Sequence, residues 1–260
     1  MKKNSIDTIV FIGAGNVATH LAAAFKDTGR RILQVYSRSE SSAKKLAEQV
    51  GVSWCCNINK INPDADLYII SVTDTAIVNI AKELKVTNGL VVHTSGFMPL
   101  EVIKVVSEDY GVFYPLQTFS KTKQLDFLTI PMCIEANNED NKKLLEDLAL
   151  SFSTDVRAIN SEQRKIIHLA AVFACNYTNA MYAVAEEVLK SADIPFDILK
   201  PLIRETADKV MYLSPVDAQT GPARRMDATV MKEHLVMLDR DDYKKLYEKI
   251  SALISKKYNS

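Results

Sequence analysis

The chain has 260 residues, which is enough for one large domain or two modest ones with a substantial core. Hydrophobic residues make up 47% and charged residues 25%, and 32 basic and 32 acidic side chains leave no net charge. This balance argues against a nucleic-acid partner. No run approaches the ~18 apolar residues of a membrane span, so we expect no membrane partner.

Apolar runs alternate with amphipathic stretches along the first part of the chain. The runs, which predict strands, span residues 8–12, 32–37, 66–72, 90–93, 112–114, 129–135 and 155–159. The amphipathic stretches, which predict helices, span residues 18–26, 41–50, 75–84, 100–106 and 139–150. Near-continuous apolar strands separated by helices are typical of a parallel sheet covered on both faces. We therefore predict an α/β domain with a doubly wound, mostly parallel sheet over residues 1–159.

The pattern changes after Asn160. Helical periodicity covers residues 161–191, with Asn160 or Ser161 as the N-cap, and then residues 197–213. Two more helices are expected, one from the Gly221-Pro222 turn to about residue 238 and one with an apolar stripe over residues 243–254. Glycine follows the same division, because seven of the eight glycines lie within residues 1–111. Residues 160–260 are therefore predicted to form an all-α domain.

The four cysteines indicate the compartment. Cys55, Cys56, Cys133 and Cys175 lack metal-ligand spacing, and an adjacent pair makes a poor disulfide framework. The apolar stretch 9–12 is shorter than the ~7–15 residues of a signal-peptide core. We expect reduced thiols, no metal and a cytoplasmic protein.

A glycine loop lies between the first predicted strand and the first predicted helix. Gly13 permits a tight turn, Gly15 permits close approach of a pyrophosphate, and the small Ala18 lets helix and strand pack closely. The helix N-terminus then faces the phosphates with its unpaired N–H groups. The strand–turn–helix context makes the motif specific. The residues expected to bind the cofactor here are Gly13, Ala14, Gly15, Asn16 and Val17.

The end of the second strand predicts which dinucleotide binds. An NAD site places an acidic residue there, whereas this strand ends in Ser37, Arg38 and Ser39, with no carboxylate before Glu40. These side chains suit the 2′-phosphate of NADP(H), which is the expected cofactor. The alternative is a solvated arginine at the start of the next helix.

Two further strand ends are expected to border the same crevice, because ligands of such sheets bind outside the carboxyl ends of the strands. Their small polar residues suit contacts to the nicotinamide. These residues are Val72, Thr73 and Asp74 after one strand, and Thr94, Ser95 and Gly96 after the other.

The long helix after residue 160 carries polar residues on an otherwise apolar face. Asn176 lies about 80° around the helix from His168 and about 12 Å along its axis, and Asn179 lies about 20° around from His168. We expect His168 and Asn176 to be catalytic and Asn179 to bind substrate. The alternative is a hydrogen-bonded core histidine with packing asparagines.

The turn around Gly221 presents a second polar group. Arg225 and Asp227 follow it within the expected first helical turn. Arg225 is one of two adjacent arginines, and guanidinium groups suit a carboxylate or phosphate of a substrate. We expect Arg225 and Asp227 to bind an anionic small-molecule substrate. The alternative is a helix cap formed by Asp227 beside solvated arginines.

Several segments spread over essentially the full chain resemble a known family in the same order. They are GAGNVATHL, DLYIISVTD, VVHTSG, YPLQTFS, HLAAVFACNY and TGPARRMDATVMKEHL. The family is grouped with the deazaflavin-dependent NADP oxidoreductases, and its helical half is a domain of unknown function. The first domain also resembles those of pyrroline-5-carboxylate reductase, 6-phosphogluconate dehydrogenase and ketopantoate reductase.

This resemblance implies a Rossmann domain, a helical domain that forms a homodimer, and a nicotinamide-dependent oxidoreductase. The expected reaction transfers a hydride between NADP(H) and a small carbonyl, such as a ketopantoate-like 2-oxo acid, or an imine. Related enzymes place a catalytic lysine on the first long interdomain helix. Here His168 holds a comparable position and Lys165 lies one turn earlier, so either is a candidate proton donor. The alternatives are a non-catalytic dinucleotide sensor and a deazaflavin-dependent NADP reductase.

Overall fold

A computed structural model describes residues 5–86, 88–120 and 125–258. The chain divides into two compact units, Met1–Val172 and Phe173–Ser260, and each is described by itself. The change in sequence pattern after residue 159 coincides with the start of a helix at Ser161, whereas the division between compact units falls after Val172. The domain boundary at residue 159 stays a prediction.

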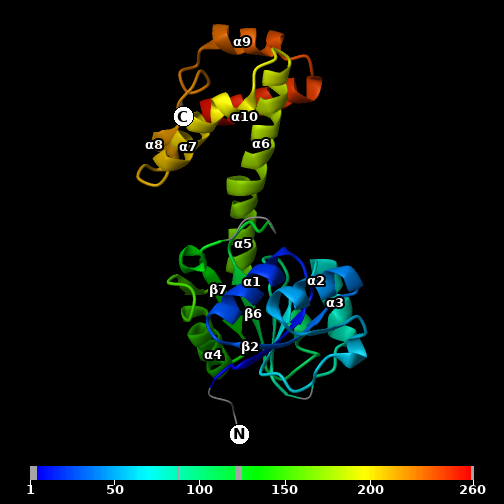
Figure 1. The fold of residues 1–260 in the computed structure, drawn as a ribbon. Helices are drawn as coiled ribbons and strands as arrows, with labels where there is room; N and C mark the ends of the chain where they lie inside the picture. Colours follow the sequence, from blue (N-terminus) through cyan, green and yellow to red (C-terminus); the bar gives the residue numbers. More distant parts are fainter. Residues whose placement is uncertain (1–4, 87, 121–124, 259–260) are drawn as a thin grey trace. The chain divides into compact units, whose positions relative to one another are not determined.

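The first unit is built on one sheet (Figure 1). Its strands are β1 (Thr8–Ile12), β2 (Arg31–Tyr36), β3 (Ser53–Cys55), β4 (Leu67–Ile70), β5 (Leu90–His93), β6 (Tyr110–Pro115), β7 (Met132–Ala136) and β8 (Val156–Ala158). The order across the sheet is β3-β2-β1-β4-β5-β6-β7-β8. Within the described residues only β6 and β7 pair antiparallel. The prediction of a doubly wound, mostly parallel sheet is confirmed.

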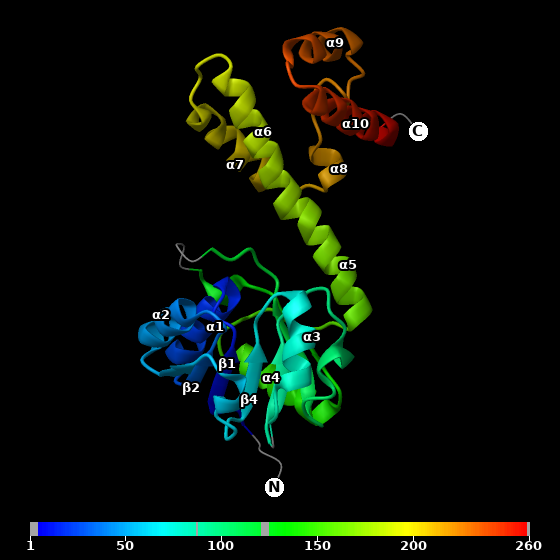
Figure 2. The same cartoon turned by 90° about the vertical axis from the view of Figure 1, so that its right-hand side faces the viewer.

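Helices cover both faces of this sheet (Figures 1 and 2). They are α1 (Asn16–Asp27), α2 (Glu40–Val50), α3 (Asp74–Glu83) and α4 (Glu139–Leu150), with 3₁₀ turns η1 (Ile58–Lys60), η2 (Leu100–Ile103) and η3 (Phe127–Thr129). The helix α5 (Ser161–Ala171) follows β8, and Arg164 is its buried residue. Ile9 and Phe11 of β1 pack with α1 and α4, whereas Val10 and Ile12 pack with α3. Because alternate residues of a strand point to opposite faces, burial of both faces explains the continuous apolar runs.

Two details of the first unit differ from the sequence-based expectation. The three-residue strand β3 was not predicted, and the stretch 100–106 forms only the 3₁₀ turn Leu100–Ile103. Pro99 precedes that turn, and Ser95 and Pro99 bend the chain sharply before it.

The strand register brings four loops to one edge of the sheet. Gly13 N–H donates to Tyr36 O at 2.8 Å, Ser71 N–H donates to Ile12 O at 2.8 Å, and Thr94 N–H donates to Ile70 O at 3.1 Å. The loops that follow β1, β2, β4 and β5 therefore start side by side at the carboxyl ends of parallel strands.

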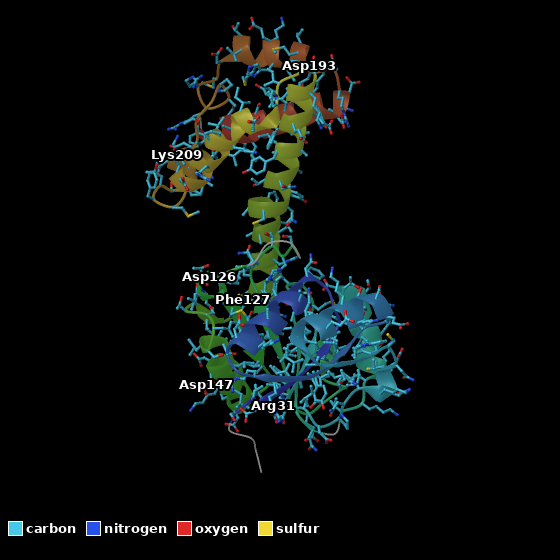
Figure 3. All side chains as sticks on the ribbon, in the orientation of Figure 1. Arg31, Asp126, Phe127, Asp147, Asp193 and Lys209 are labelled. Atoms are coloured by element: carbon cyan, nitrogen blue, oxygen red, sulfur yellow. The ribbon has the colours of Figure 1, made fainter. Side chains whose placement is uncertain are left out.

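The second unit is helical, as predicted. After the π-helical segment η4 (Val172–Tyr177) it contains α6 (Thr178–Lys190), η5 (Phe196–Leu199), α7 (Lys200–Lys209), α8 (Pro215–Ala218), α9 (Ala228–Met237) and α10 (Asp241–Tyr258). The side chain of Lys209 at the end of α7 is labelled in Figure 3. The helix expected over 161–191 is thus interrupted by η4, and the one expected over 197–213 consists of η5 and α7. No described helix has the length and apolar character needed to cross a membrane.

Apolar side chains of the second unit are largely exposed. Between residues 173 and 258, the described part of this unit, only Ala223 is buried. Leu202, Val236 and Leu253 are 61%, 78% and 70% exposed. A single chain therefore gives this unit almost no core of its own.

Candidate cofactor and active site

The glycine loop after β1 combines a forced turn with an open backbone. Gly13 has φ +117°, and a Cβ there would lie 2.1 Å from the carbonyl oxygen of Ser71. A Cβ at Gly15 would meet nothing within 4 Å. Gly15 is the N-cap of α1, no side chain caps it, and the first turn of α1 contains no acidic residue. The N–H groups of this turn thus form an uncovered site for an anion.

The other predicted loop residues have distinct surroundings. Ala14 is buried and Val17 packs against the core, so both position the loop. The Asn16 side chain donates to the carbonyl oxygen of Phe119 at 2.7 Å. His20 Nε2 donates to Ser120 O at 2.8 Å, which ties residues 119–120 to α1. Sequence reasoning did not anticipate this contact, because it joins positions a hundred residues apart.

The end of β2 exposes Arg38 to solvent. Ser37 Oγ accepts from the Ser39 backbone N–H at 3.3 Å, and Ser39 Oγ accepts from the N–H of Ser42 at 3.4 Å as the N-cap of α2. Among the described residues, no hydrogen bond or ion pair of the Arg38 guanidinium is present. Its charge is therefore available to a ligand at this strand end.

The loop after β4 leads directly into α3. Thr73 is the N-cap residue, its Oγ1 lies 3.4 Å from Thr75 Oγ1, and Asp74 begins the helix. Val72 is partly buried beside Gly13, whose Cβ would lie 2.9 Å from Val72 Cγ1. This loop and the glycine loop are therefore in direct contact.

The loop after β5 folds around a neutral histidine. His93 Nδ1 accepts from the Ser95 N–H at 3.2 Å, so Nε2 carries the proton that it donates to Pro99 O at 3.3 Å. Burial, assisted by the charge of Arg164, lowers the pKa of His93 to about 3. Ser95 Oγ accepts from the N–H groups of Phe97 and Met98, at 3.0 and 2.9 Å. The predicted residues Thr94 and Ser95 are both buried, which makes this loop a compact structure.

Three segments converge on Gly96. A Cβ there would lie 2.8 Å from His168 Nδ1 on α5 and 2.8 Å from Tyr114 Cζ on β6. Tyr114 Oη lies 3.5 Å from His168 Nδ1, and the two rings pack edge to face. Tyr114 was missed as a site residue, although it begins the YPLQTFS segment of the family resemblance. The structure thus brings His168 together with the predicted loop of Gly96 and adds Tyr114.

The other predicted site residues belong to the second unit. Asn176 in η4 and Asn179 on α6 are exposed, as is Arg225. Asp227 Oδ1 accepts from the N–H of Val230 at 3.2 Å and is the N-cap of α9. The capping role considered from the sequence is therefore present for Asp227. The catalytic role of Asn176 and substrate binding by Asn179, Arg225 and Asp227 stay predictions.

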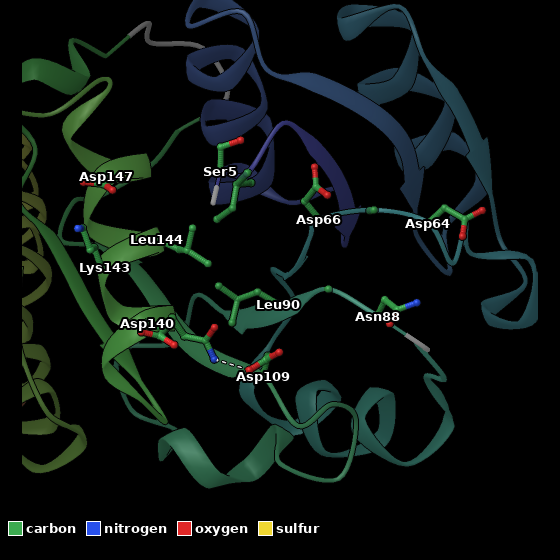
Figure 4. Close-up of a pocket in the computed structure, with 14 residues that line it drawn as sticks. Ser5, Asp64, Asp66, Asn88, Leu90, Asp109, Asp140, Lys143, Leu144 and Asp147 are labelled. Carbon is green, nitrogen blue, oxygen red and sulfur yellow. Dashed lines mark hydrogen bonds between the residues drawn. The ribbon is translucent and has the colours of Figure 1, made fainter. Parts of the chain in front are cut away.

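A separate cavity of about 930 Å³ opens at the other edge of the sheet (Figure 4). Residues near the starts of β1, β4, β5 and β6 line it together with residues of α4, and several are acidic. Asp66 accepts from the backbone of Asp7 and Thr8, and Asp109 accepts from Asn141 at 2.8 Å. No cluster of histidine, cysteine or acidic residues suited to a metal occurs in the described part of the chain. We therefore place the candidate site at the carboxyl edge.

The fold is that of Rossmann-type oxidoreductases, and comparisons with known proteins agree. Residues 8–95 match the family described as coenzyme F420-dependent NADP oxidoreductase, and residues 130–254 match a domain of unknown function, DUF2520. A Bacteroides fragilis structure, provisionally described as an NADP oxidoreductase, is 46% identical, with a TM-score of 0.90, and the match covers 97% of this chain and 99% of that one. The chain belongs to this two-part oxidoreductase family.

More distant structures share the fold. Pyrroline-5-carboxylate reductase from Streptococcus pyogenes has 15% identity and a TM-score of 0.65, with 98% of this chain and 100% of that one covered. An imine reductase from Myxococcus stipitatus in complex with NADP⁺ has 14% identity and a TM-score of 0.62, with 96% and 92% covered. A search among curated proteins gave no match.

Proposed function

We propose that this protein is an NADP(H)-dependent oxidoreductase that transfers a hydride between the nicotinamide and a small carbonyl or imine compound. The observation that carries the proposal is the position of His168 and Tyr114 against Gly96, in one of the loops that line the carboxyl edge of the sheet. The glycine loop starts at the same edge. A candidate dinucleotide-binding loop and a candidate proton donor thus belong to the same edge of the sheet, which is where such sheets bind ligands.

The residues around the glycine loop fit a dinucleotide. The uncapped first turn of α1 suits a pyrophosphate, and the open space at Gly15 permits close approach. Arg38, with Ser37 and Ser39, supports NADP(H) over NAD(H), because a guanidinium forms strong hydrogen bonds to a 2′-phosphate. The loops of Thr73 and Thr94 border the same edge and suit the nicotinamide side.

Bound nicotinamide supplies or accepts the hydride, so the chain must move the matching proton. His168 is the proposed donor to the new alkoxide or amine, because an imidazole can act as general acid in one direction and as general base in the other. The Tyr114 hydroxyl, with its Oη 3.5 Å from Nδ1, would help to orient the His168 ring. The competing donor, Lys165, forms an ion pair with Glu162 at 2.8 Å.

In the helical unit, single polar residues are proposed to bind substrate. Asn176 and Asn179 would orient the substrate, and Arg225 would hold an anionic group such as the carboxylate of a 2-oxo acid. Asp227 would contact the substrate in addition to its role as the N-cap of α9.

The exposed apolar residues of the helical unit support a homodimer. An exposed apolar surface of this extent is unfavourable in water, and a small unit buries too small a fraction of its surface to be stable without a core. A second copy of the same unit would cover these side chains.

Four free cysteines, two of them buried, support a reducing compartment such as the cytoplasm.

The test is oxidation of NADPH in the presence of small 2-oxo acids and cyclic imines, with F420 as a separate substrate. We expect turnover with at least one carbonyl or imine compound. Replacement His168→Gln should lower kcat by about 10²- to 10⁴-fold, the usual contribution of general acid catalysis, and leave the NADPH Kd nearly unchanged.

Lys165→Gln is the matched control, and we expect it to retain turnover. Loss of activity in Lys165→Gln with normal activity in His168→Gln would reverse the assignment of the donor. Tight NADPH binding without turnover on any substrate of the panel would contradict an enzymatic function and favour the alternative of a non-catalytic dinucleotide sensor.

A further inference from the structure

One charged side chain near the candidate site is fully buried and is not used by the proposed chemistry. Arg164 on α5 has a side-chain exposure of 1%, and its counter-ion Glu135 at the end of β7 has 16%. Arg164 lies one helical turn before His168, and residues four apart share a helix face. Burial of an arginine is costly unless its donors are paired, so its partners reveal what it holds.

Its partners lie on separate segments of the first unit. Arg164 Nε donates to the carbonyl oxygen of Ser95 at 3.1 Å, and Nη2 donates to that of Met98 at 2.6 Å. Nη1 forms the ion pair with Glu135. One planar guanidinium therefore joins two carbonyl groups of the loop after β5 to the carboxylate of β7.

Ser161 at the start of α5 completes this network. Its Oγ donates to Glu135 Oε2 at 2.8 Å and accepts from Leu100 N–H at 2.9 Å and Arg164 Nη2 at 3.2 Å. Its backbone N–H donates to Glu135 Oε1 at 3.0 Å. The hydroxyl thus uses its single donor and both acceptor positions. The network therefore ties the loop Ser95–Met98 to α5 and β7 through several bonds at once.

The loop that Arg164 holds is the loop that contacts His168. Gly96 lies between the Ser95 and Met98 carbonyls, and its backbone approaches both the imidazole of His168 and the ring of Tyr114. A shift of this loop would remove the surface against which the imidazole rests.

We propose that Arg164, with Glu135 as counter-ion, is a positioning residue that sets the orientation of the His168 imidazole through the loop Ser95–Met98. The inference rests on the proposed function for its catalytic consequence. Its structural part, the control of the His168 ring, is independent of any reaction. A displacement of about 1 Å in a catalytic group lowers turnover by up to about 10²-fold.

Arg164→Lys is the most informative variant. It retains the positive charge beside Glu135 and removes the planar guanidinium that donates to both carbonyl groups of the loop. Arg157→Lys is the matched control, since Arg157 pairs with Asp155 on the surface of the same unit. The first readout is the NMR signal of the His168 ring nitrogens, which reports tautomer and pKa. We expect these signals to change in Arg164→Lys and not in Arg157→Lys.

The second readout is kinetic. Arg164→Lys should lower kcat by about 10- to 100-fold, with an NADPH Kd within about twofold of wild type. It should also shift the limb of the kcat–pH profile that His168→Gln abolishes. His168 signals and a pH profile equal to those of Arg157→Lys would overturn the proposal.

The double variant Arg164→Met/Glu135→Gln tests the proposal if the single variant does not fold. Removal of both charges of a buried pair is far less destabilising than removal of one. We expect it to fold, bind NADPH and still show altered His168 signals. A double variant with wild-type signals and kcat would reduce the pair to a stabilising role. Absence of turnover in the wild-type protein would refute the proposed function, and the NMR comparison would still decide the role of Arg164.

Discussion

The two glycines of the glycine loop differ in whether they tolerate a side chain. Gly13 has φ +117°, and a Cβ there would collide with the Ser71 carbonyl, so Gly13→Ala should prevent stable folding. Gly15 has φ −80° and open space at its Cβ, so Gly15→Ala should keep the free energy of unfolding within about 1 kcal/mol of wild type. The added methyl group would occupy the approach of the pyrophosphate.

We therefore expect Gly15→Ala to weaken NADPH binding by at least about tenfold with little change in Tm. Thermal unfolding and titration calorimetry measure the two effects. Equal NADPH affinity in Gly15→Ala and wild type would exclude this loop as the pyrophosphate site.

The proposed role of Arg38 in the choice between NADPH and NADH is also tested at a single residue. A charge-assisted hydrogen bond contributes about 1.5–3 kcal/mol, which corresponds to roughly a 10- to 100-fold change in affinity. Arg38→Ala should raise the Kd for NADPH by this factor and leave the Kd for NADH almost unchanged.

Arg31→Ala is the control, because Arg31 is exposed at the opposite end of the same strand. Fluorescence titration with both nucleotides gives the comparison. An equal loss for NADPH and NADH in Arg38→Ala would be inconsistent with recognition of a 2′-phosphate.

At the scale of the elements, variants of Asp227, the N-cap residue of α9, can separate helix capping from substrate binding. Asp227→Ala removes the side-chain bond to the Val230 N–H and should lower the free energy of unfolding by about 1 kcal/mol. Asp227→Ser keeps a capping oxygen and removes the carboxylate. Its Tm should stay near wild type, as measured by thermal unfolding.

The KM of Asp227→Ser then tests whether Asp227 also binds substrate. A raised KM at unchanged Tm would support contact with substrate, and an unchanged KM would leave Asp227 as a helix cap.

Elements with strong periodicity were predictable from the sequence, and those that depend on distant contacts were not. The apolar runs of β1 and β5 gave bounds equal to the observed ones, because both sheet faces are buried. The strand β3 has three residues and leaves no periodic pattern. Arg164 looks like a solvated residue of an amphipathic helix, and only its contacts with Ser95 and Met98 explain its burial. Tyr114 likewise meets His168 across 54 positions.

At the scale of the whole molecule, the exposed apolar side chains of the second unit predict self-association. Light scattering after size exclusion should give twice the mass of one chain. Leu202→Glu on α7 and Leu253→Glu on α10 would place a charge on this surface and should shift the protein toward monomer.

Leu150→Glu, at an exposed position that ends α4 of the first unit, is the matched control and should leave the mass unchanged. A wild-type protein that is monomeric at micromolar concentration would contradict association through the helical unit. So would a Leu150→Glu control that dissociates as much as Leu202→Glu and Leu253→Glu.

The order of the sheet has a consequence for contacts between molecules. Its two edges are β3 and β8, each only three residues long. Arg157 within β8 forms an ion pair with Asp155 just before it. Edges this short, one of them charged, offer an incoming strand few unpaired backbone groups, which is how native sheets resist fibril-like growth. Crowded molecules of this protein should therefore meet through side chains of helices and not through added strands.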